Sequence, residues 1–382
     1  MSNDYLAYQT FDSLQAFFST ISALIANRAL LKGLGVGDAN SSATFALLLT
    51  IMKDAMSRVA TIVFAHRFGL QIEPDAKRYR FLADLLNDSA FFLELYSPYL
   101  SPLGKVAALS FGQALRAMCG VAAGASKAAL SVHFAKHDNL AELNAKEASQ
   151  ETAVGLMGLL IGTVVVRVVE DQTSVVYLMI VLVLAHLAMN YLGVRYVQMD
   201  VLNRQRATIL FQEYLRSGKI MTPAQVAHEE NILFWSPVMV DENGKRVARI
   251  EIAESYGEAM KTAVNGRIVD GQMHTKFIGK VVKGYVTPIK ILLWHKCSAE
   301  DALQAWFEAV ELAWSGPSLE LVKTKSDGFD DEEKKEEEDE FRAHSVAFWD
   351  SLERAGWKLD SQSLETGVPV RLNILEGSKK KQ

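Results

Sequence analysis

The feature that most constrains the fold is a pair of long apolar stretches separated by a short polar link. The stretches run from Ala153 to Val169, with one arginine, and from Val175 to Leu192, with one histidine and one asparagine. Each is close to the roughly 20 residues that a helix needs to cross the hydrocarbon core of a bilayer. We therefore predict that residues 153–192 form a helical hairpin that spans a membrane.

The flanks of this hairpin support the same interpretation. Basic residues lie on both outer sides, whereas the link is acidic apart from the nearby Arg167, so the positive-inside rule keeps both outer ends on the cytosol-like side. Gly158 and Gly162 have the GxxxG spacing that lets two helix backbones approach closely in lipid. The alternative is a hairpin of core helices in a soluble protein. Arg167, His186 and Asn190 keep this alternative open, because polar groups in lipid need partners.

The amino-acid composition of the chain changes after about residue 215. Long helical patterns rich in Ala, Leu, Gly and Val give way to an ordinary soluble composition. We expect a mainly helical, membrane-embedded domain over residues 1–215, a linker over 216–235 and a small α+β domain over 236–376.

The second part has recognisable strand and helix signals. Alternating residues predict strands at 274–282 and 287–296, and Ser298 with Asp301 begins an amphipathic helix in a near capping box. Another helix and a terminal strand follow, so we expect the helices to cover one face of a sheet. Residues 323–340 contain a dense acidic block, which predicts a solvated, disordered loop.

Several functional classes lack their sequence signatures. Cys119 and Cys297 cannot form a disulfide framework and have no metal-ligand spacing, so we predict no metal site. The segment GLGVG at 33–37 lies between two helices rather than after a strand, which disfavours a dinucleotide loop. No nucleophile elbow or HExxH motif is present, so we predict no enzymatic activity and can name no cofactor. The absence of a basic patch with interleaved aromatics argues against nucleic acid.

The first residues are acidic at two positions and have no basic n-region. We therefore expect neither a secretory signal nor a transit peptide in the sequence as it stands. The expected location is a membrane whose organelle the sequence does not identify.

Three further helices, predicted over 43–69, 77–95 and 105–136, carry narrow charged stripes on otherwise apolar surfaces. A helix facing water usually has a broader polar face, so we expect these charges to turn inward. The candidate ligand-binding residues are Lys53, Asp54 and Arg58 on the first helix, Lys77, Arg80, Asp84 and Asp88 on the second, and Arg116, Lys127 and His133 on the third.

The stripes allow two interpretations. If His133 is left out, the candidate residues include six basic and three acidic side chains. This surplus predicts a net-basic pocket for a small anionic metabolite carrying a phosphate or carboxylate. Alternatively, Arg80 with Asp84 and Asp54 with Arg58 have i, i+4 spacing and neutralise each other in a purely structural network.

Several blocks of sequence in a fixed order carry a family resemblance. They include DYLAYQTFDSLQAF, GLGVGDA, KDAMSRVATIVFAHRFG, DAKRYRFLADLLND, GVAAGASKAALSVHFA, NLAELNAKEASQETAVGLMGLLIG and LERAGW. Together these blocks resemble the root UV-B sensitive (RUS) protein family over nearly the whole chain. The resemblance implies a membrane-associated protein, with plant members linked to UV-B responses, early root development and vitamin B6 homeostasis. It carries over no catalytic residues.

The expected function is a non-enzymatic role in metabolite homeostasis or stress signalling through the polar site. The alternative is a membrane-anchored scaffold that recruits a partner through its α+β domain. The partners considered are a membrane, a small anionic metabolite and another RUS-family protein.

Overall fold

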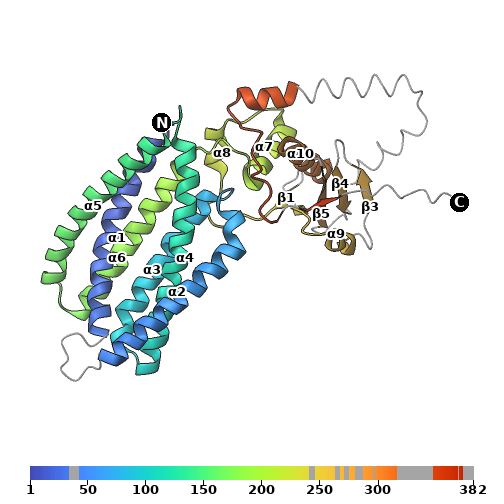
Figure 1. The fold of residues 1–382 in the computed structure, drawn as a ribbon. Coiled ribbons are helices and arrows are strands. Elements are labelled where there is room, and N and C mark those ends of the chain that lie inside the picture. The colour runs from blue at the N-terminus through green and yellow to red at the C-terminus, as the bar shows by residue number, and fades with distance from the viewer. Residues whose placement is uncertain are drawn as a thin grey trace, which may run out of the picture. The chain divides into compact units, whose positions relative to one another are not determined.

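The computed structural model describes two compact units, Met1–Val197 and Gln198–Gln382 (Figure 1). The first is helical and the second combines helices with a small sheet, which confirms the expected fold class. The residues described are 1–33, 43–240, 246–262, 267–270, 275–279, 287–295, 297–315, 347–368 and 370–372. The predicted acidic loop at 323–340 lies outside them.

Long helices that alternate in direction form the first unit (Figure 1). Short connections between most of them favour this antiparallel arrangement. The helices are α1 (Tyr5–Gly33), α2 (Ala43–Ile72), α3 (Ala76–Tyr96), the 3₁₀ turn η1 (Ser97–Tyr99), α4 (Pro102–Phe134), α5 (Leu140–Val168) and α6 (Gln172–Tyr196). In this unit α1 packs on α5 and α6, and α4 packs on α2 and α3.

The predicted hairpin corresponds to α5 and α6. Asp171 caps the second helix, because its side chain accepts a hydrogen bond of 2.9 Å from the backbone N–H of Ser174. The two predicted segments are therefore consecutive helices, both of which pack on α1, with α5 beginning before the predicted apolar stretch and α6 continuing beyond it.

The two pairs of glycines in the bundle behave differently. A Cβ at Gly158 would lie 2.9 Å from the Cβ of Thr20, and one at Gly162 would lie 2.5 Å from the Cδ1 of Leu24. These short distances show that α5 and α1 approach closely along this seam, as the GxxxG spacing predicts. Gly120 and Gly124 have the same spacing on α4, but a Cβ at either position would meet nothing within 4 Å.

The outer surface of the bundle is strongly apolar. Among the described residues, α1, α4, α5 and α6 are long and apolar enough to cross a membrane, as judged by length and composition. Residues such as Leu156, Leu160 and Val164 on α5 and Val181 and Leu184 on α6 are exposed. An apolar face this extensive needs a non-aqueous or protein environment.

The second unit begins earlier than the sequence suggested. Its helices include α7 (Arg204–Ser217) and α8 (Pro223–Glu229), which occupy the end of the expected helical domain and the expected linker at 216–235. Leu210 and Phe211 of α7 are fully buried in one cluster with Trp306. Thus α7 is helical in pattern but belongs to the core of the second unit.

A mixed sheet organises this unit. Its strands are β1 (Val238–Val240), β2 (Arg246–Ile252), β3 (Arg267–Asp270), β4 (Thr275–Gly279), β5 (Thr287–Trp294) and β6 (Arg371–Leu372). The order is β1-β2-β5-β4-β3, with β6 paired to β5; β2 and β6 run parallel to β5, and the other pairs are antiparallel. The sequence patterns predict β4, β5 and the terminal strand but not β1, β2 or β3.

The helices of this unit are α9 (Tyr256–Thr262), α10 (Ala299–Ser315) and a segment at 347–354, besides α7 and α8. The predicted cap of α10 is confirmed, because the N–H groups of Ser298 and Asp301 donate to each other's side chains at 2.8 and 3.1 Å. Ile289, Ile291 and Leu293 pack in the cluster that holds α10. Their neighbour Lys290 contacts Glu258 of α9, so helices lie on both sheet faces rather than one.

Candidate polar site in the helical bundle

Arg80 on α3 is the centre of a buried group of polar side chains from three helices. Its Nη2 donates to Asp12 Oδ1 at 2.8 Å and to Gln15 Oε1 at 3.3 Å, both on α1. Its Nη1 lies 3.2 Å from both carboxylate oxygens of Asp84 on the next turn of α3. The Arg80 side chain is only 11% exposed, so these partners replace the water that a guanidinium would otherwise need.

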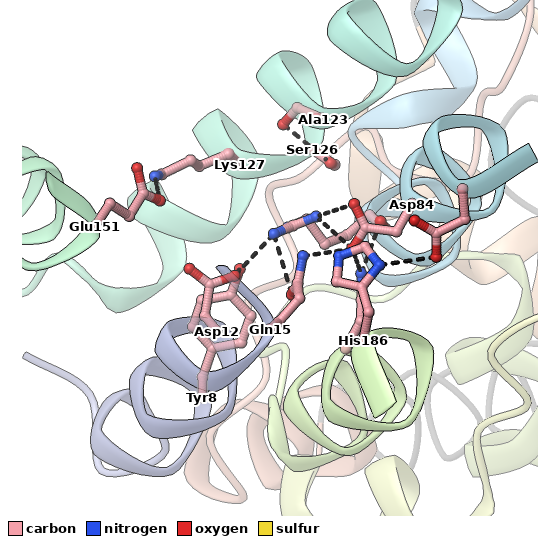
Figure 2. Close-up of polar contacts among 12 residues, drawn as sticks. Tyr8, Asp12, Gln15, Asp84, Ala123, Ser126, Lys127, Glu151 and His186 are labelled. Carbon is pink, nitrogen blue, oxygen red and sulfur yellow. Dashed lines mark hydrogen bonds and ion pairs between the residues drawn. The ribbon is translucent and has the colours of Figure 1, made fainter. Parts of the chain in front are cut away.

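Helix α6 completes this group (Figure 2). His186 Nδ1 lies 2.8 Å from Asp88 Oδ2, and His186 Nε2 lies 3.6 Å from Asp84 Oδ2. Asp84 also accepts hydrogen bonds from the amide groups of Gln15 and Asn190. We call the set of Asp12, Gln15, Arg80, Asp84, Asp88, His186 and Asn190 the Arg80 cluster.

The charge of the Arg80 cluster is opposite in sign to the expected net-basic site. Three aspartates face one arginine, and a protonated His186 would offset only one of the two remaining negative charges. Buried carboxylates favour a proton, a cation or hydrogen-bond donors over a free anion. The predicted basic surplus counted side chains of α2, α3 and α4 that have different partners and do not all join one group, and it did not include Asp12.

Arg116 and Lys127 form separate pairs. Arg116 binds Glu94 of α3 through two nitrogens, at 2.9 and 2.5 Å, and lies over the ring of Phe91 at 4.8 Å. Lys127 contacts Glu151 of α5 (Figure 2) and lies 4.0 Å from Glu147. Each predicted base in these pairs therefore has its own carboxylate.

The remaining candidates lie elsewhere. His133 Nε2 is 3.0 Å from Asp4 Oδ2 near the start of the chain, and both side chains are buried. Lys77 is buried on the first turn of α3. On α2, Lys53 is half-buried, whereas Asp54 and Arg58 are exposed. The Arg80–Asp84 pair of the structural interpretation is formed, but no Asp54–Arg58 ion pair occurs among the described residues.

Several buried polar atoms near these groups have no hydrogen-bond partner among the described residues. They are both amide atoms of Gln9, the hydroxyl of Tyr5, Glu147 Oε2, Asp88 Oδ1 and Asn190 Oδ1. Glu147 is close enough to Asp12 and Lys127 to interact electrostatically with both, which places these groups in one polar region. Buried polar atoms of this kind usually bind water or a ligand.

The predicted site did not include the side chains that α1 and α5 contribute. Asp12 and Gln15 are three positions apart on α1 and therefore on one face, among other polar residues such as Gln9, Thr10 and Ser13. That spacing was available as a signal. No comparable spacing identifies the partners of Arg116 and Lys127. Only the packing of α3 and α5 against α4 shows which glutamates these two bases contact.

These features define a helical bundle with an apolar exterior and a polar centre, and sequence comparisons place the chain in a family. The profile described as "Vitamin B6 photo-protection and homoeostasis domain" matches residues 1–218, more than half of the chain. The protein belongs to this family, whose members include the root UV-B sensitive proteins. The match contains the whole bundle and extends through α7.

Curated relatives agree with the assignment. "RUS family member 1" of Dictyostelium discoideum is 39% identical over 238 residues, which cover 61% of this chain and 45% of that protein. "Protein root UVB sensitive 3" of Arabidopsis thaliana is 29% identical over 317 residues, covering 81% of this chain and 71% of that protein. The match to "Protein root UVB sensitive 2, chloroplastic" of the same plant covers 81% of this chain at 26% identity.

This chain therefore spans less than half the length of the Dictyostelium relative. No solved structure matches it.

Proposed function

We propose that the protein is a membrane-embedded, non-enzymatic component of vitamin B6 homeostasis that binds a polar solute at the Arg80 cluster. The observation that carries this proposal is the reversal of the usual distribution of polarity. Paired charges and unsatisfied polar atoms lie inside the bundle, whereas the exposed faces of α5 and α6 are apolar. In a membrane, ionisable side chains that face the interior of a bundle are typical of solute or ion pathways.

The charge of the cluster indicates the chemistry of the solute. A surplus of carboxylates favours a group that is cationic or zwitterionic. Vitamin B6 compounds contain a pyridine nitrogen, and the protonated nitrogen is commonly paired with an aspartate in enzymes that use the phosphate form as a cofactor. Asp84 and Asp88 carry carboxylates suited to this role, and the buried amide of Gln9, one turn before Asp12 on α1, offers both a donor and an acceptor.

Membrane insertion is the first part to test. Isolated membranes are washed with alkaline carbonate, and the protein is followed in the pellet and the supernatant. We expect it to stay in the pellet, because α5 and α6 would be within the hydrocarbon core. Release into the supernatant would contradict the proposal.

Solute binding is tested by Gln9→Met, which replaces an unsatisfied amide by an apolar side chain of similar size. A purely structural Gln9 predicts unchanged or higher stability with unchanged function. Our proposal predicts retained stability but altered cellular levels of pyridoxal, pyridoxine and their phosphates, in cells whose own copy is replaced by the variant. Gln113→Met, on half-buried α4 surface, is the matched control. Vitamer levels equal to those of the wild type in both variants would argue against solute binding at this site.

A further inference from the structure

A cavity lies away from the Arg80 cluster, where the end of α1 meets the α5–α6 link and the end of α3. It has a volume of about 190 Å³. Its apolar wall includes Ile25, Leu95, Val165 and Val176. None of its lining residues belongs to the Arg80 cluster, so it is an independent feature of the bundle.

The polar side of this cavity carries more positive than negative charge. Arg28 and Lys32 lie one helical turn apart on α1, and Glu170 is the acid that lines the same cavity. Among the described residues, neither Arg28 nor Lys32 forms an ion pair. Two cations with a single acid create a site that attracts an anion.

The geometry of Arg28 is fixed by the protein itself. Its Nη1 donates to the backbone carbonyls of Val166 at 2.9 Å and Val169 at 3.1 Å, at the C-terminal end of α5. These two bonds hold the guanidinium in place and leave its other N–H donors without acceptors among the described residues. The amine of Lys32 lies 5.8 Å from the centre of the Tyr99 ring, a cation–π contact that keeps it beside the cavity.

We propose that this cavity binds the phosphate group of a ligand that also has an apolar body. An arginine fork with a nearby lysine suits a phosphate, which has several acceptor oxygens and up to two negative charges. The valines and the rings of Tyr96 and Tyr99 provide contacts for the apolar part. The small volume limits what fits inside to a headgroup or a single ring.

Two kinds of molecule have this chemistry, namely a phospholipid headgroup and a soluble phosphate ester. Basic pockets between membrane helices bind anionic lipid headgroups on the matrix or cytoplasmic side, and the positive-inside rule places the α5–α6 link on the opposite face of the membrane. The α5–α6 link would lie at the level of the headgroups if the hairpin spans the bilayer. A soluble aromatic phosphate would instead enter from the aqueous side, so the two sources are separated by experiment.

The test compares Lys32→Gln with Arg167→Gln in the full chain. Lys32 is exposed and its replacement should leave the fold intact, whereas Arg28 also holds the end of α5 and is less informative. Arg167 is an exposed cation at the same end of α5 that does not line the cavity. Binding of phenyl phosphate is measured by calorimetry in detergent. Phosphatidic acid that remains bound after purification from nanodiscs of phosphatidylcholine and phosphatidic acid is measured by mass spectrometry.

We expect Lys32→Gln to weaken phenyl phosphate binding by about tenfold, the usual effect of losing one charge-assisted hydrogen bond, with Arg167→Gln like the wild type. Loss of retained phosphatidic acid from Lys32→Gln alone would also support the proposal and identify a lipid as the source. The proposal is overturned if the wild type retains neither molecule, if Lys32→Gln changes neither, or if Arg167→Gln has the same effect. These results are independent of the Gln9→Met test.

Discussion

The two units of this protein use buried charge and apolar surface in opposite ways. The bundle places Arg80, three aspartates and a histidine inside and exposes leucines and valines. The second unit has a conventional apolar core around Trp306 and Phe211, with Arg206 and Glu230 as a closely paired buried exception. The contrast supports the proposal that the exterior of the bundle lies in a membrane, whereas the second unit has the usual arrangement of an apolar core beneath a polar surface.

The largest effect is expected from removing the central charge of the bundle. Arg80→Met leaves Asp12 and Asp84 buried without their cation, which typically costs about 3–5 kcal/mol. Unfolding of the full chain in detergent would measure this loss. Arg58→Met removes an exposed arginine of α2 and should change stability by less than about 0.5 kcal/mol. Equal stability of the Arg80 variant and the wild type would contradict the importance of the cluster.

A pair of leucine substitutions tests which side of each unit is its interior. Leu210→Ala removes a fully buried side chain from the second unit and should cost about 3 kcal/mol, through lost contacts and a cavity. Leu160→Ala changes an exposed position of α5 and should cost less than about 0.5 kcal/mol. Thermal unfolding measured for both variants decides the comparison. A large loss for Leu160→Ala would mean that α5 is covered by another protein surface.

The glycine seam between α1 and α5 provides a smaller effect with an internal control. Gly158→Val forces a side chain against Thr20, and overpacking of this kind costs about 1–3 kcal/mol. Gly120→Ala on α4 has open space and removes a flexible residue from a helix, so it should be neutral or stabilise by up to about 1 kcal/mol. Opposite signs are expected in denaturant titrations. Destabilisation by both substitutions to the same extent would contradict the close packing of α1 and α5 at Gly158.

The smallest expected effect is on the pH dependence of the stability of the second unit. Burial opposes the charge of Lys290, but its hydrogen bonds to Glu251 and Glu258 outweigh burial and raise its pKa. A raised lysine pKa stabilises the folded state below the unfolded value of about 10.4, and this stabilisation is lost as pH rises through the folded pKa. Lys290→Met should therefore flatten the alkaline fall in stability of the second unit, by less than about 1 kcal/mol.

Unfolding of the wild type and Lys290→Met at a series of pH values from neutral to strongly alkaline would measure this difference. Lys358→Met is a suitable control, since Lys358 pairs with Asp200 on exposed surface. Parallel curves for the wild type and Lys290→Met would show that the Lys290 pairs contribute nothing.

Local patterns were sufficient to predict the hairpin of α5 and α6, the cap of α10 and the inward position of Arg80. Each of these depends on residues within a few turns of one another. The first compact unit ends before the expected residue 215, because α7 has an amphipathic pattern that fits either unit and its packing against Trp306 places it in the second. The acidic surplus of the Arg80 cluster was not foreseen for a similar reason. Helical periodicity gives the direction of Arg80, but it does not identify Asp12, 68 residues earlier, as its partner.

That separation along the chain has a consequence for how the protein is made. Asp12 leaves the ribosome well before Arg80, and His186 follows only when α6, the last helix of the bundle, has been synthesised. Until then the nascent bundle holds carboxylates whose partners do not yet exist. If the bundle is inserted into a membrane as proposed, the early helices must remain in contact with water, or with an insertion factor that shields them, until α6 is synthesised.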